Sequence, residues 1–453
     1  MMPALTLSPD QETALAAVLA KLKADKEAVL CGAAGTGKTT VMSAVIDAWS
    51  GGVQFFAPTG KAASRLKQSV GEADTIHAAF FGSVVEEQPD DDDDDAQQPS
   101  KREKLVFGAP HPPEGAGRST LLVIDEASMV NDELAATVRE QAELVGSSIL
   151  WVGDHHQLPP VTGSWGADLQ NPDGELTTVH RQAQDAPALA LATAIREDRI
   201  ETFGTWGGDC TIHRKTENGR AAPAHVMLGQ AALWRARAGS TSPTGAVASD
   251  DRVLLTFTNK NRSAINTLVR RYQQRGQAPE LGETLLCTFN ARDIGLMNGE
   301  TAEIVGVRRH DVLSNFMRSD VYAVELEGYS GEMIIAPEAF EPRQRMSPRR
   351  HYKSYWEPLL NPYHREHWQR ALDNNLSDEE IEKLRTLVRG RGLQVTWGYC
   401  LTVHKSQGSQ WAEVGFVSCG FYRSKATDDP EFWRRLGYTA FTRTEAVLRI
   451  FVV

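Results

Sequence analysis

The residues best suited to chemistry lie in one glycine-rich stretch near the start of the chain. An apolar run ends at Gly32, and the pattern from there reads G-x-x-x-x-G-K-T. Gly32, Gly35 and Gly37 allow a tight turn that brings backbone N–H groups onto phosphate oxygens. Lys38 would reach the β- and γ-phosphates, and the Thr39 hydroxyl would hold Mg²⁺. An ordinary glycine-rich turn is the alternative, although chance gives this pattern in only about one or two of a hundred such chains.

Two acidic residues follow an apolar strand about 90 residues after this phosphate-binding loop (Walker A). The stretch 121–124 is entirely apolar and ends at Asp125 and Glu126. The carboxyl ends of parallel strands form the ligand crevice of open α/β sheets. Asp125 would complete the Mg²⁺ shell, and Glu126 would polarise an attacking water. The pair means little alone, but after a phosphate loop it predicts nucleotide hydrolysis.

A second apolar run, 149–153, ends at Asp154 and continues into His155, His156 and Gln157. The amide of Gln157 is suited to sensing a γ-phosphate. The two histidines suggest a metal site, but no third ligand follows at a suitable spacing, so a metal here is disfavoured.

Two further side chains have a functional and an ordinary interpretation. Gln11 lies one turn into a helix predicted over 8–24, where it is either a solvated residue or an amide that reads an adenine edge. Lys61 begins the helix after Pro58-Thr-Gly, where it is either a surface lysine or a contact to a nucleic-acid phosphate. Next to a phosphate loop, the phosphate contact is favoured.

Composition indicates a soluble globular chain of 453 residues with three or four domains. No stretch approaches the roughly 20 apolar residues of a membrane span, and no signal segment is recognisable. The five cysteines are scattered without a C-x-x-C pair, which argues against a zinc site or a disulfide framework. We expect a reduced, cytoplasmic setting in a bacterial or phage-infected cell.

The net charge of −11 is concentrated in one segment. Residues 86–95 contain eight acids, and without them 51 acidic residues face 48 basic ones, a net charge of −3. Such a balance permits a basic groove for nucleic acid without requiring one.

The order of elements predicts an α/β protein with insertions. Residues 83–118 break the α/β pattern and predict a small insertion with a disordered acidic loop. Short alternating strands over 282–338 predict a small β-barrel. Basic residues then mix with Tyr352, Tyr355 and Trp356, which suits either base stacking or packing on a helix. The α/β pattern returns with a strand over 393–401.

Seven motifs in this order resemble the superfamily 1 DNA helicases, above all the RecD-like branch that includes the phage Dda helicase. They read G-A-A-G-T-G-K-T, A-P-T-G-K-A-A, V-I-D-E-A-S, G-D-H-H-Q-L-P-P-V, V-H-R-Q, T-V-H-K-S-Q-G and Y-T-A-F-T-R-T. The resemblance implies two RecA-like parallel-sheet domains, 1–82 with 119–180 and 181–281 with 393–453. It places a strand-separating pin in 83–118, and an SH3-like barrel with a basic and aromatic helical arm in 282–392.

The resemblance also implies roles for individual residues. The catalytic set comprises Lys38, Glu126, Gln157, Arg181 and Arg443, in which the two arginines stabilise charge on the γ-phosphate. The nucleotide-binding positions are Gln11, Gly32, Gly35, Gly37, Lys38, Thr39, Thr40, Gln407 and Gly408. The Mg²⁺ ligands are Thr39 and Asp125. Single-stranded DNA would contact Pro58, Thr59, Lys61, His77, Phe80, Asn259, Thr402 and His404.

The implied activity is ATP-driven, 5′ to 3′ movement along single-stranded DNA with unwinding of duplex at junctions. Expected partners are single-stranded DNA, junctions of single- and double-stranded DNA, and replication or recombination proteins, with no membrane and a monomer as the functional form. Two alternatives remain open: an RNA-directed helicase of the same superfamily, and a binding module switched by its nucleotide. Gln410 departs from the acid that many relatives carry at this position.

Overall fold

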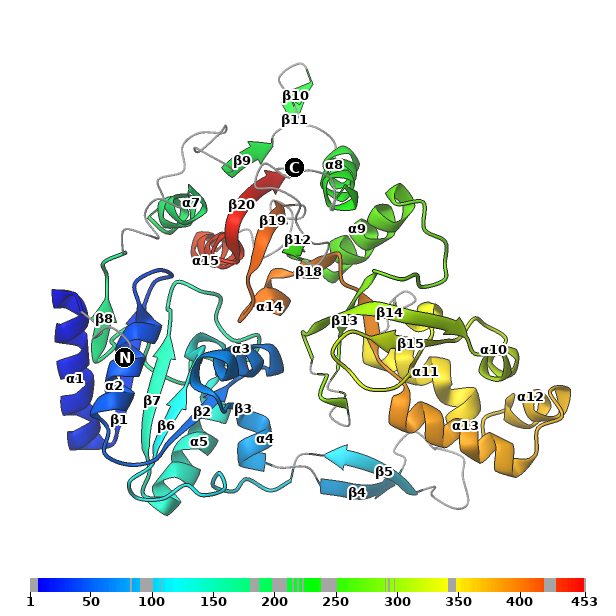
Figure 1. Ribbon diagram of the computed structural model, residues 1–453, viewed down its shortest axis with the longest axis horizontal. Coiled ribbons are helices and arrows are strands. Elements are labelled where there is room, and N and C mark those ends of the chain that lie inside the picture. Colours follow the sequence, from blue (N-terminus) through cyan, green and yellow to red (C-terminus); the bar gives the residue numbers. More distant parts are fainter. Residues whose placement is uncertain are drawn as a thin grey trace. The chain divides into compact units, whose positions relative to one another are not determined.

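The computed structural model describes residues 7–81, 84–89, 101–106, 108–179, 187–197, 210–213, 216–217, 220–221, 224–237, 251–289, 291, 294–296, 298–340, 348–418 and 429–451. The chain forms two compact units, Met1–Asp185 and Ala186–Val453 (Figure 1). Each unit is built around its own parallel sheet.

The first unit contains a six-stranded sheet in the order β3-β2-β6-β7-β1-β8, with every neighbouring pair parallel. Its strands are β1 (Glu27–Gly32), β2 (Val53–Ala57), β3 (Asp74–Thr75), β6 (Leu121–Ile124), β7 (Ser148–Gly153) and β8 (Gly174–Leu176). All residues of β6 and β7 are buried. Strands covered on both faces need such continuous apolar sequence.

Helices cover both faces of this sheet (Figure 1). They are α1 (Pro9–Asp25), α2 (Lys38–Ala48), α3 (Gly60–Val70), α4 (Ile76–Phe81) and α5 (Asp132–Val145), with a 3₁₀ turn at Ala127–Met129. Alternate strand residues enter opposite cores, as the two-residue period of a strand requires. Leu150 and Val152 pack with α1, α2 and α3, whereas Ile149 and Trp151 pack with α4 and α5.

The insertion in the first unit contains an antiparallel ribbon. Strands β4 (Val84–Pro89) and β5 (Lys101–Val106) pair along their whole length. The acidic run 90–95 lies outside the described residues, so the predicted disorder of that loop stays a prediction.

The second unit contains a parallel sheet in the order β18-β12-β19-β20-β9. Its strands are β9 (Cys210–His213), β12 (Arg252–Thr256), β18 (Cys400–Thr402), β19 (Trp411–Val417) and β20 (Thr444–Phe451). Its helices are α7 (Pro187–Arg196), α8 (Ala224–Ala236), α9 (Asn259–Tyr272), α14 (Val403–Ser406) and α15 (Pro430–Phe441), and β10 (Thr216–Glu217) pairs with β11 (Arg220–Ala221). Helix α7 packs with α15, and α8 packs with α9.

An antiparallel sheet in the order β16-β15-β14-β13-β17 is inserted into this unit. Its strands are β13 (Thr284–Cys287), β14 (Thr301–Arg309), β15 (Tyr322–Leu326), β16 (Met333–Ile335) and β17 (Val395–Trp397). The helical arm contains α10 (Asp311–Met317), a 3₁₀ turn (Pro337–Ala339), α11 (Pro348–Leu360), α12 (His367–Asp373) and α13 (Asp378–Arg391). These sheets confirm the predicted fold class: two RecA-like parallel-sheet parts, a small insertion in the first, and an SH3-like barrel with a helical arm in the second.

The aromatic residues of the arm pack inside it. The Trp356 ring is fully buried, and Tyr352 and Tyr355 lie edge-on to it with ring centroids 6.3 and 5.0 Å away. Trp356 belongs to a hydrophobic core that the arm shares with Ala323 and Ile334 of the barrel strands, and both tyrosines pack against that core. Of the two interpretations, packing on a helix is the correct one for these rings. The basic residues Arg343 and Arg345 lie outside the described residues.

The strand predicted over 393–401 is divided between two sheets. Residues Val395–Trp397 form β17 in the antiparallel sheet, and Cys400–Thr402 form β18 in the parallel sheet. The chain changes sheet at Gly398, where an added Cβ would lie 3.0 Å from the Cγ2 atom of Thr284. This close crossing of two backbones has no signature in hydrophobic periodicity.

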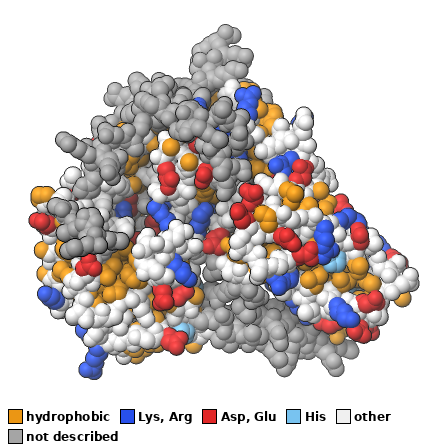
Figure 2. All heavy atoms as spheres, viewed as in Figure 1, with side chains coloured by type: hydrophobic (Ala, Val, Ile, Leu, Met, Phe, Trp, Pro, Cys, Tyr) orange, Lys and Arg blue, Asp and Glu red, His pale blue; other side chains and the backbone are white. Residues whose placement is uncertain are grey.

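On the face seen in Figure 2, acidic and basic side chains alternate over the described surface. That mixture fits the near-neutral charge of the chain without its acidic run. Among the described helices, none is long and apolar enough to span a bilayer.

Candidate active site

The phosphate-binding loop connects β1 directly to α2. Gly35 and Gly37 have φ angles of 79° and 85°, in the left-handed region that favours glycine. Gly32 is packed so tightly that an added Cβ would lie 2.6 Å from Thr36 Oγ1 and 2.8 Å from Leu176 Cβ. The loop therefore needs glycine at two positions for conformation and at a third for space.

We expect Gly32→Ala to lower the free energy of unfolding by about 1–3 kcal/mol, because the methyl group overpacks the loop. Chemical denaturation measures the change. Gly117→Ala is the matched control, since an added Cβ there meets nothing within 4 Å. Equal stability of the two variants would contradict the tight packing at Gly32.

Lys38 begins α2 and folds back over the loop. Its Nζ atom donates to the carbonyl oxygens of Gly32 at 2.7 Å and Ala33 at 3.1 Å. Thr39 and Thr40 follow in the first turn of the helix, where backbone N–H groups and the helix dipole favour an anion. The loop thus presents an ammonium group and a helix N-terminus, the usual elements of a phosphate site.

Gln11 connects α1 to the same loop. Its Oε1 accepts from the Ser8 N–H at 3.0 Å, and its Nε2 donates to the Thr36 carbonyl at 3.2 Å. The buried amide is therefore held next to the loop by a capping box on one side and by the loop backbone on the other. Its reading of adenine stays a prediction.

Asp125 and Glu126 follow β6 at the edge of the sheet where β1 also ends. The Asp125 N–H donates to the Phe56 carbonyl, and its carboxylate accepts from the Glu126 N–H, both at 2.9 Å. Glu126 has a φ of 52°, a left-handed conformation that is uncommon outside glycine. Residues held in such conformations cluster at functional sites.

Burial, together with the neighbouring Glu126 carboxylate, raises the pKa of Asp125 to about 6. The Lys38 ammonium and the Arg65 guanidinium oppose this rise in pKa, which places both cations near the carboxylate. A bound cation would stabilise the ionised form of such a buried carboxylate, so Asp125 is suited to a site that binds a cation.

We therefore expect Asp125→Asn to stabilise the nucleotide-free protein at neutral pH by roughly 1–3 kcal/mol. The raised pKa means that the wild type loses stability as the pH rises from the ordinary pKa of 3.8 to the raised pKa of about 6, whereas the asparagine variant does not. Below pH 4 the two should converge. Thermal unfolding between pH 4 and 8 measures the difference.

Asp132→Asn provides the control of opposite sign. A hydrogen bond from Ser164 helps hold the pKa of Asp132 below its usual value, so its loss should destabilise at neutral pH. If Asp125→Asn and the wild type are equally stable at pH 7, the negative charge of Asp125 does not destabilise the nucleotide-free protein.

Gln157 lies in the turn after β7. The side chain is 4% exposed, and within the described part of the chain its Oε1 has no hydrogen-bond partner. Its N–H donates to the Asp154 carbonyl at 3.1 Å, and the His156 N–H donates to the Asp154 carboxylate at 3.0 Å. The turn is thus fixed by Asp154 while the amide oxygen of Gln157 remains available to a ligand.

Cys31 and His155 form a contact that sequence reasoning missed. Cys31 Sγ lies 3.2 Å from His155 Nδ1, which joins the residue before Gly32 to the turn that carries Gln157. Burial raises the pKa of the Cys31 thiol to about 11, so the group remains a neutral thiol. Parallel pairing of β1 with β7, in which Cys31 faces Gly153, is the only signal that could have predicted this contact.

In the second unit, the predicted nucleotide residues cluster around the end of α15. The Arg443 side chain is 3% exposed, and it donates to the Thr439 carbonyl and the Thr442 hydroxyl at 3.0 Å each. Gln407 is buried beside Gly408, which has a φ of 74°. Arg181 lies outside the described residues, so its role stays a prediction.

The predicted DNA contacts of the first unit are only partly accessible. Pro58, Thr59 and Lys61 are half-buried at the start of α3, where the Thr59 hydroxyl caps the helix by accepting from the Ala62 N–H. Phe80 is a correction, because its ring is 0% exposed and packs edge-on against Phe56 at 5.3 Å. It cannot stack on a base in this conformation.

The neighbouring Phe81 was missed by sequence reasoning. It is half-buried, and its ring stacks on that of His77 at 5.6 Å with an interplanar angle of 23°. Only helical phase distinguishes the two phenylalanines: α4 buries Phe80 completely, whereas Phe81 is half-buried and packs against the same core.

In the second unit, Asn259 is exposed at the start of α9, while Thr402 and His404 are more enclosed. Burial lowers the pKa of His404, whose ring lies 6.4 Å from that of Phe257. Asn259 follows β12, Thr402 is the last residue of β18, and His404 comes just after it. Because β12 and β18 pair in parallel, the carboxyl ends of two adjacent strands bring these residues together.

The oxygen donors fit Mg²⁺ as nucleotide sites bind it. Among the described residues, no three or more His, Cys, Asp or Glu side chains are grouped to hold a metal ion. Mg²⁺ usually takes one or two protein oxygens and completes its shell with phosphates and waters. The Thr39 hydroxyl and the Asp125 carboxylate are donors of this kind.

Comparison with known proteins shows what two regions of the chain are similar to. Residues 6–217 match the model of an AAA domain, and residues 398–451 match that of a UvrD-like helicase C-terminal domain. The chain is 33% identical over 198 residues to the ATP-dependent RecD2 DNA helicase of Deinococcus radiodurans. In these two regions the chain is similar to helicases, and over the aligned residues it is similar to a helicase of the RecD-like branch of superfamily 1.

The matches to curated relatives are partial. The RecD2 alignment covers 42% of this chain and 24% of the relative. A probable conjugal transfer protein TraA of Sinorhizobium fredii is 30% identical over 184 residues, 39% of this chain and 14% of that protein. The chain thus spans a quarter or less of the length of these curated relatives. The finer likeness to the Dda helicase stays a prediction.

Solved structures of Pif1 helicases are similar over most of the chain. The Pif1 helicase from Bacteroides in complex with ADP-AlF3 and ssDNA is 16% identical with a TM-score of 0.49, covering 99% of this chain and 93% of that one. The Candida albicans Pif1 helicase is 17% identical with a TM-score of 0.46, covering 98% and 94%.

Proposed function

We propose that this chain is an ATP-dependent DNA helicase of superfamily 1. It translocates on single-stranded DNA in the 5′ to 3′ direction and unwinds duplex by hydrolysing Mg-ATP in the cleft between its two RecA-like parts. The arrangement of Glu126 carries the proposal: the carboxylate follows β6 in a left-handed backbone, beside Asp125 and near the Lys38 loop. A protein that only binds nucleotide has no need of such a constrained base.

The first unit supplies the hydrolytic groups. Lys38 binds the β- and γ-phosphates, and Thr39 and Asp125 hold Mg²⁺, which when bound neutralises charge that develops on the phosphates. Glu126 accepts a proton from the attacking water, and Gln157 orients that water through its amide. Gln11 reads the adenine, and Thr40 completes the phosphate contacts.

The second unit supplies groups that sense the γ-phosphate. Arg443 and Arg181 stabilise charge on the transferred phosphoryl group, and Gln407 and Gly408 face the nucleotide. Because arginine fingers act only when they reach the phosphate, hydrolysis becomes coupled to closure of the cleft. Cycles of closure and opening would then move the chain along the strand.

DNA contacts are sequence-tolerant in this proposal. Pro58, Thr59, Lys61, His77, Asn259, Thr402 and His404 contact phosphates and bases, and Phe81 replaces Phe80 as the partner of His77. Binding of this kind weakens with added salt, because Lys and Arg contacts release counterions from the phosphate backbone. The protein acts as a monomer, at junctions of single- and double-stranded DNA and alongside replication or recombination proteins.

The test is ATP hydrolysis with single-stranded DNA, with single-stranded RNA and with neither, followed by unwinding of duplexes with a 5′ or a 3′ tail. Strong stimulation by DNA and unwinding from the 5′ tail are expected. Stimulation by RNA alone would establish the RNA-directed alternative. ATP binding without any stimulation would leave the nucleotide-switched module.

A further inference from the structure

The chain crosses twice between the parallel sheet of the second unit and its inserted barrel. The first crossing runs from the end of α9 at Tyr272 to the start of β13 at Thr284, and the second from Trp397 to Cys400. Because β13 and β17 pair with Leu285 opposite Trp397, the two crossings lie side by side.

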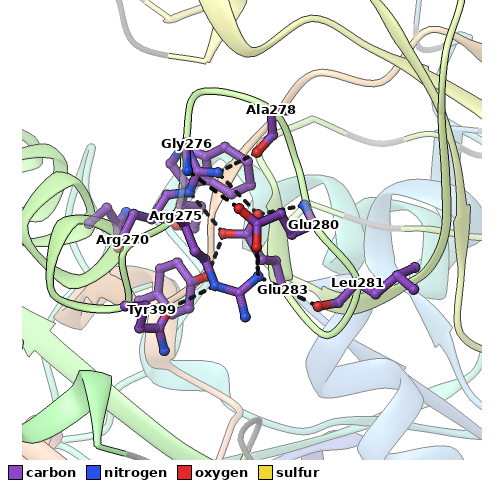
Figure 3. A network of polar contacts seen from close by, with 11 residues as sticks. Arg270, Arg275, Gly276, Ala278, Glu280, Leu281, Glu283 and Tyr399 are labelled. Atoms are coloured by element: carbon purple, nitrogen blue, oxygen red, sulfur yellow. Dashed lines mark hydrogen bonds and ion pairs between the residues drawn. The ribbon is translucent and has the colours of Figure 1, made fainter.

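A buried carboxylate joins both crossings to α9 (Figure 3). Glu283 is 0% exposed and accepts two hydrogen bonds from the Arg270 guanidinium of α9, at 2.8 and 3.1 Å. From the second crossing, the Tyr399 hydroxyl donates to the same carboxylate at 2.5 Å. The Glu280 N–H of the first crossing donates at 2.8 Å, and Arg275 Nη1 lies 3.7 Å away.

Asn266, one turn earlier on the same face of α9, holds the second crossing directly. Its Nδ2 donates to the Trp397 carbonyl at 2.8 Å, and its Oδ1 accepts from the Cys400 N–H at 2.8 Å. The Arg270 guanidinium also lies 3.8 Å from the centroid of the Trp397 ring. Two positions four residues apart on one helix therefore bind the entry to the barrel and the exit from it.

Apolar packing also joins the barrel to the parallel-sheet part of the second unit. Leu254 and Val269 of the parallel-sheet part share one hydrophobic core with Leu285 and Val324 of the barrel. The buried ion pair adds directional restraint, because removal of either partner leaves the other charge buried without compensation. The barrel is therefore not held by a flexible two-stranded hinge alone.

We propose that Glu283, Arg270, Tyr399 and Asn266 are positioning residues that clamp the barrel onto α9, so that barrel and parallel sheet move as one body in each ATP cycle. The inference rests on the proposed function. Helix α9 begins at Asn259, a proposed DNA contact. The clamp would therefore transmit force between the barrel and the single-stranded DNA along which the protein moves. Unwinding should need this connection, whereas translocation on single strands should not.

Glu283→Gln tests the clamp in the full chain. The glutamine replaces an acceptor with an NH₂ group that faces the Arg270 donors, so the network should break. Hydrogen exchange of the two crossings, 273–284 and 397–402, should become about tenfold faster. Unwinding of a tailed duplex should fall about tenfold, with DNA-stimulated ATP hydrolysis within about twofold of wild type, because the residue does not touch nucleotide.

Glu332→Gln is the matched control, since it removes an exposed barrel carboxylate that pairs with Arg308. Tyr399→Phe removes one hydroxyl from the network, so hydrogen exchange of the crossings should become faster and unwinding slower, each by less than in Glu283→Gln. If Glu283→Gln fails to fold, Tyr399→Phe tests the clamp in its place. Unchanged hydrogen exchange in both Glu283→Gln and Tyr399→Phe would overturn the clamp. So would faster exchange with normal unwinding, or equal loss of hydrolysis and unwinding. A wild type without DNA stimulation would refute the proposed function, and the exchange experiment would still decide the clamp.

Discussion

A Glu126→Gln variant is expected to bind ATP normally and to hydrolyse it about a thousandfold more slowly than wild type, because a general base contributes roughly 10²–10⁴ to the rate. Glutamine has nearly the same shape, and the hydrogen bond from residue 126 to Asp125 comes from the backbone. The binding site should therefore survive. Hydrolysis in the presence of single-stranded DNA gives the rate, and a fluorescent nucleotide gives the affinity.

Glu133→Gln serves as the control for this prediction, because Glu133 is an exposed carboxylate in the first turn of α5. It should hydrolyse ATP as wild type does. A Glu126→Gln protein that retains most of its activity would mean that another group accepts the proton, and the assignment of the catalytic base would be wrong.

Arg443→Lys should lower DNA-stimulated hydrolysis by about a thousandfold, the lower end of what an arginine finger contributes. Lysine retains the charge but lacks the planar fork that donates to Thr439, Thr442 and, at 3.5 Å, Ser409. The affinity for ATP should change little, since the first unit supplies most phosphate contacts in the proposed mechanism. Single-turnover hydrolysis and nucleotide binding separate the two effects.

A purely structural role for Arg443 would give a different result. Arg435→Lys in α15, the helix that ends just before Arg443, is the control for general damage to α15, because Arg435 pairs with Glu431 within that helix. If Arg443→Lys loses thermal stability in proportion to activity, or hydrolyses ATP normally, the residue does not act on the γ-phosphate.

The parts of the site that local sequence determines were predictable. The turn between β1 and α2 needs positive φ at Gly35 and Gly37, and only glycine adopts that conformation without strain. The buried strand before Asp125 is similarly indicated by a run of apolar residues. Both features depend on residues adjacent in the chain, so spacing alone indicates them.

Features that depend on packing between distant segments were not predictable. Hydrophobic pattern does not say which of two adjacent phenylalanines α4 turns inward, and Phe80 rather than Phe81 occupies the core. It also does not reveal that 393–401 serves two sheets, or that Glu126 takes a left-handed conformation. The contact between Cys31 and His155 arises only once β1 and β7 are neighbours.

The paired ends of the barrel insertion affect how this protein can evolve. Leu285 and Trp397 are opposite partners in an antiparallel pair, which brings their Cα atoms to within about 5 Å although more than a hundred residues separate them along the chain. An insertion whose ends are this close can gain or lose whole elements without moving the strands of its host sheet. The barrel and its arm can therefore change in length while the parallel sheet of the second unit retains its geometry.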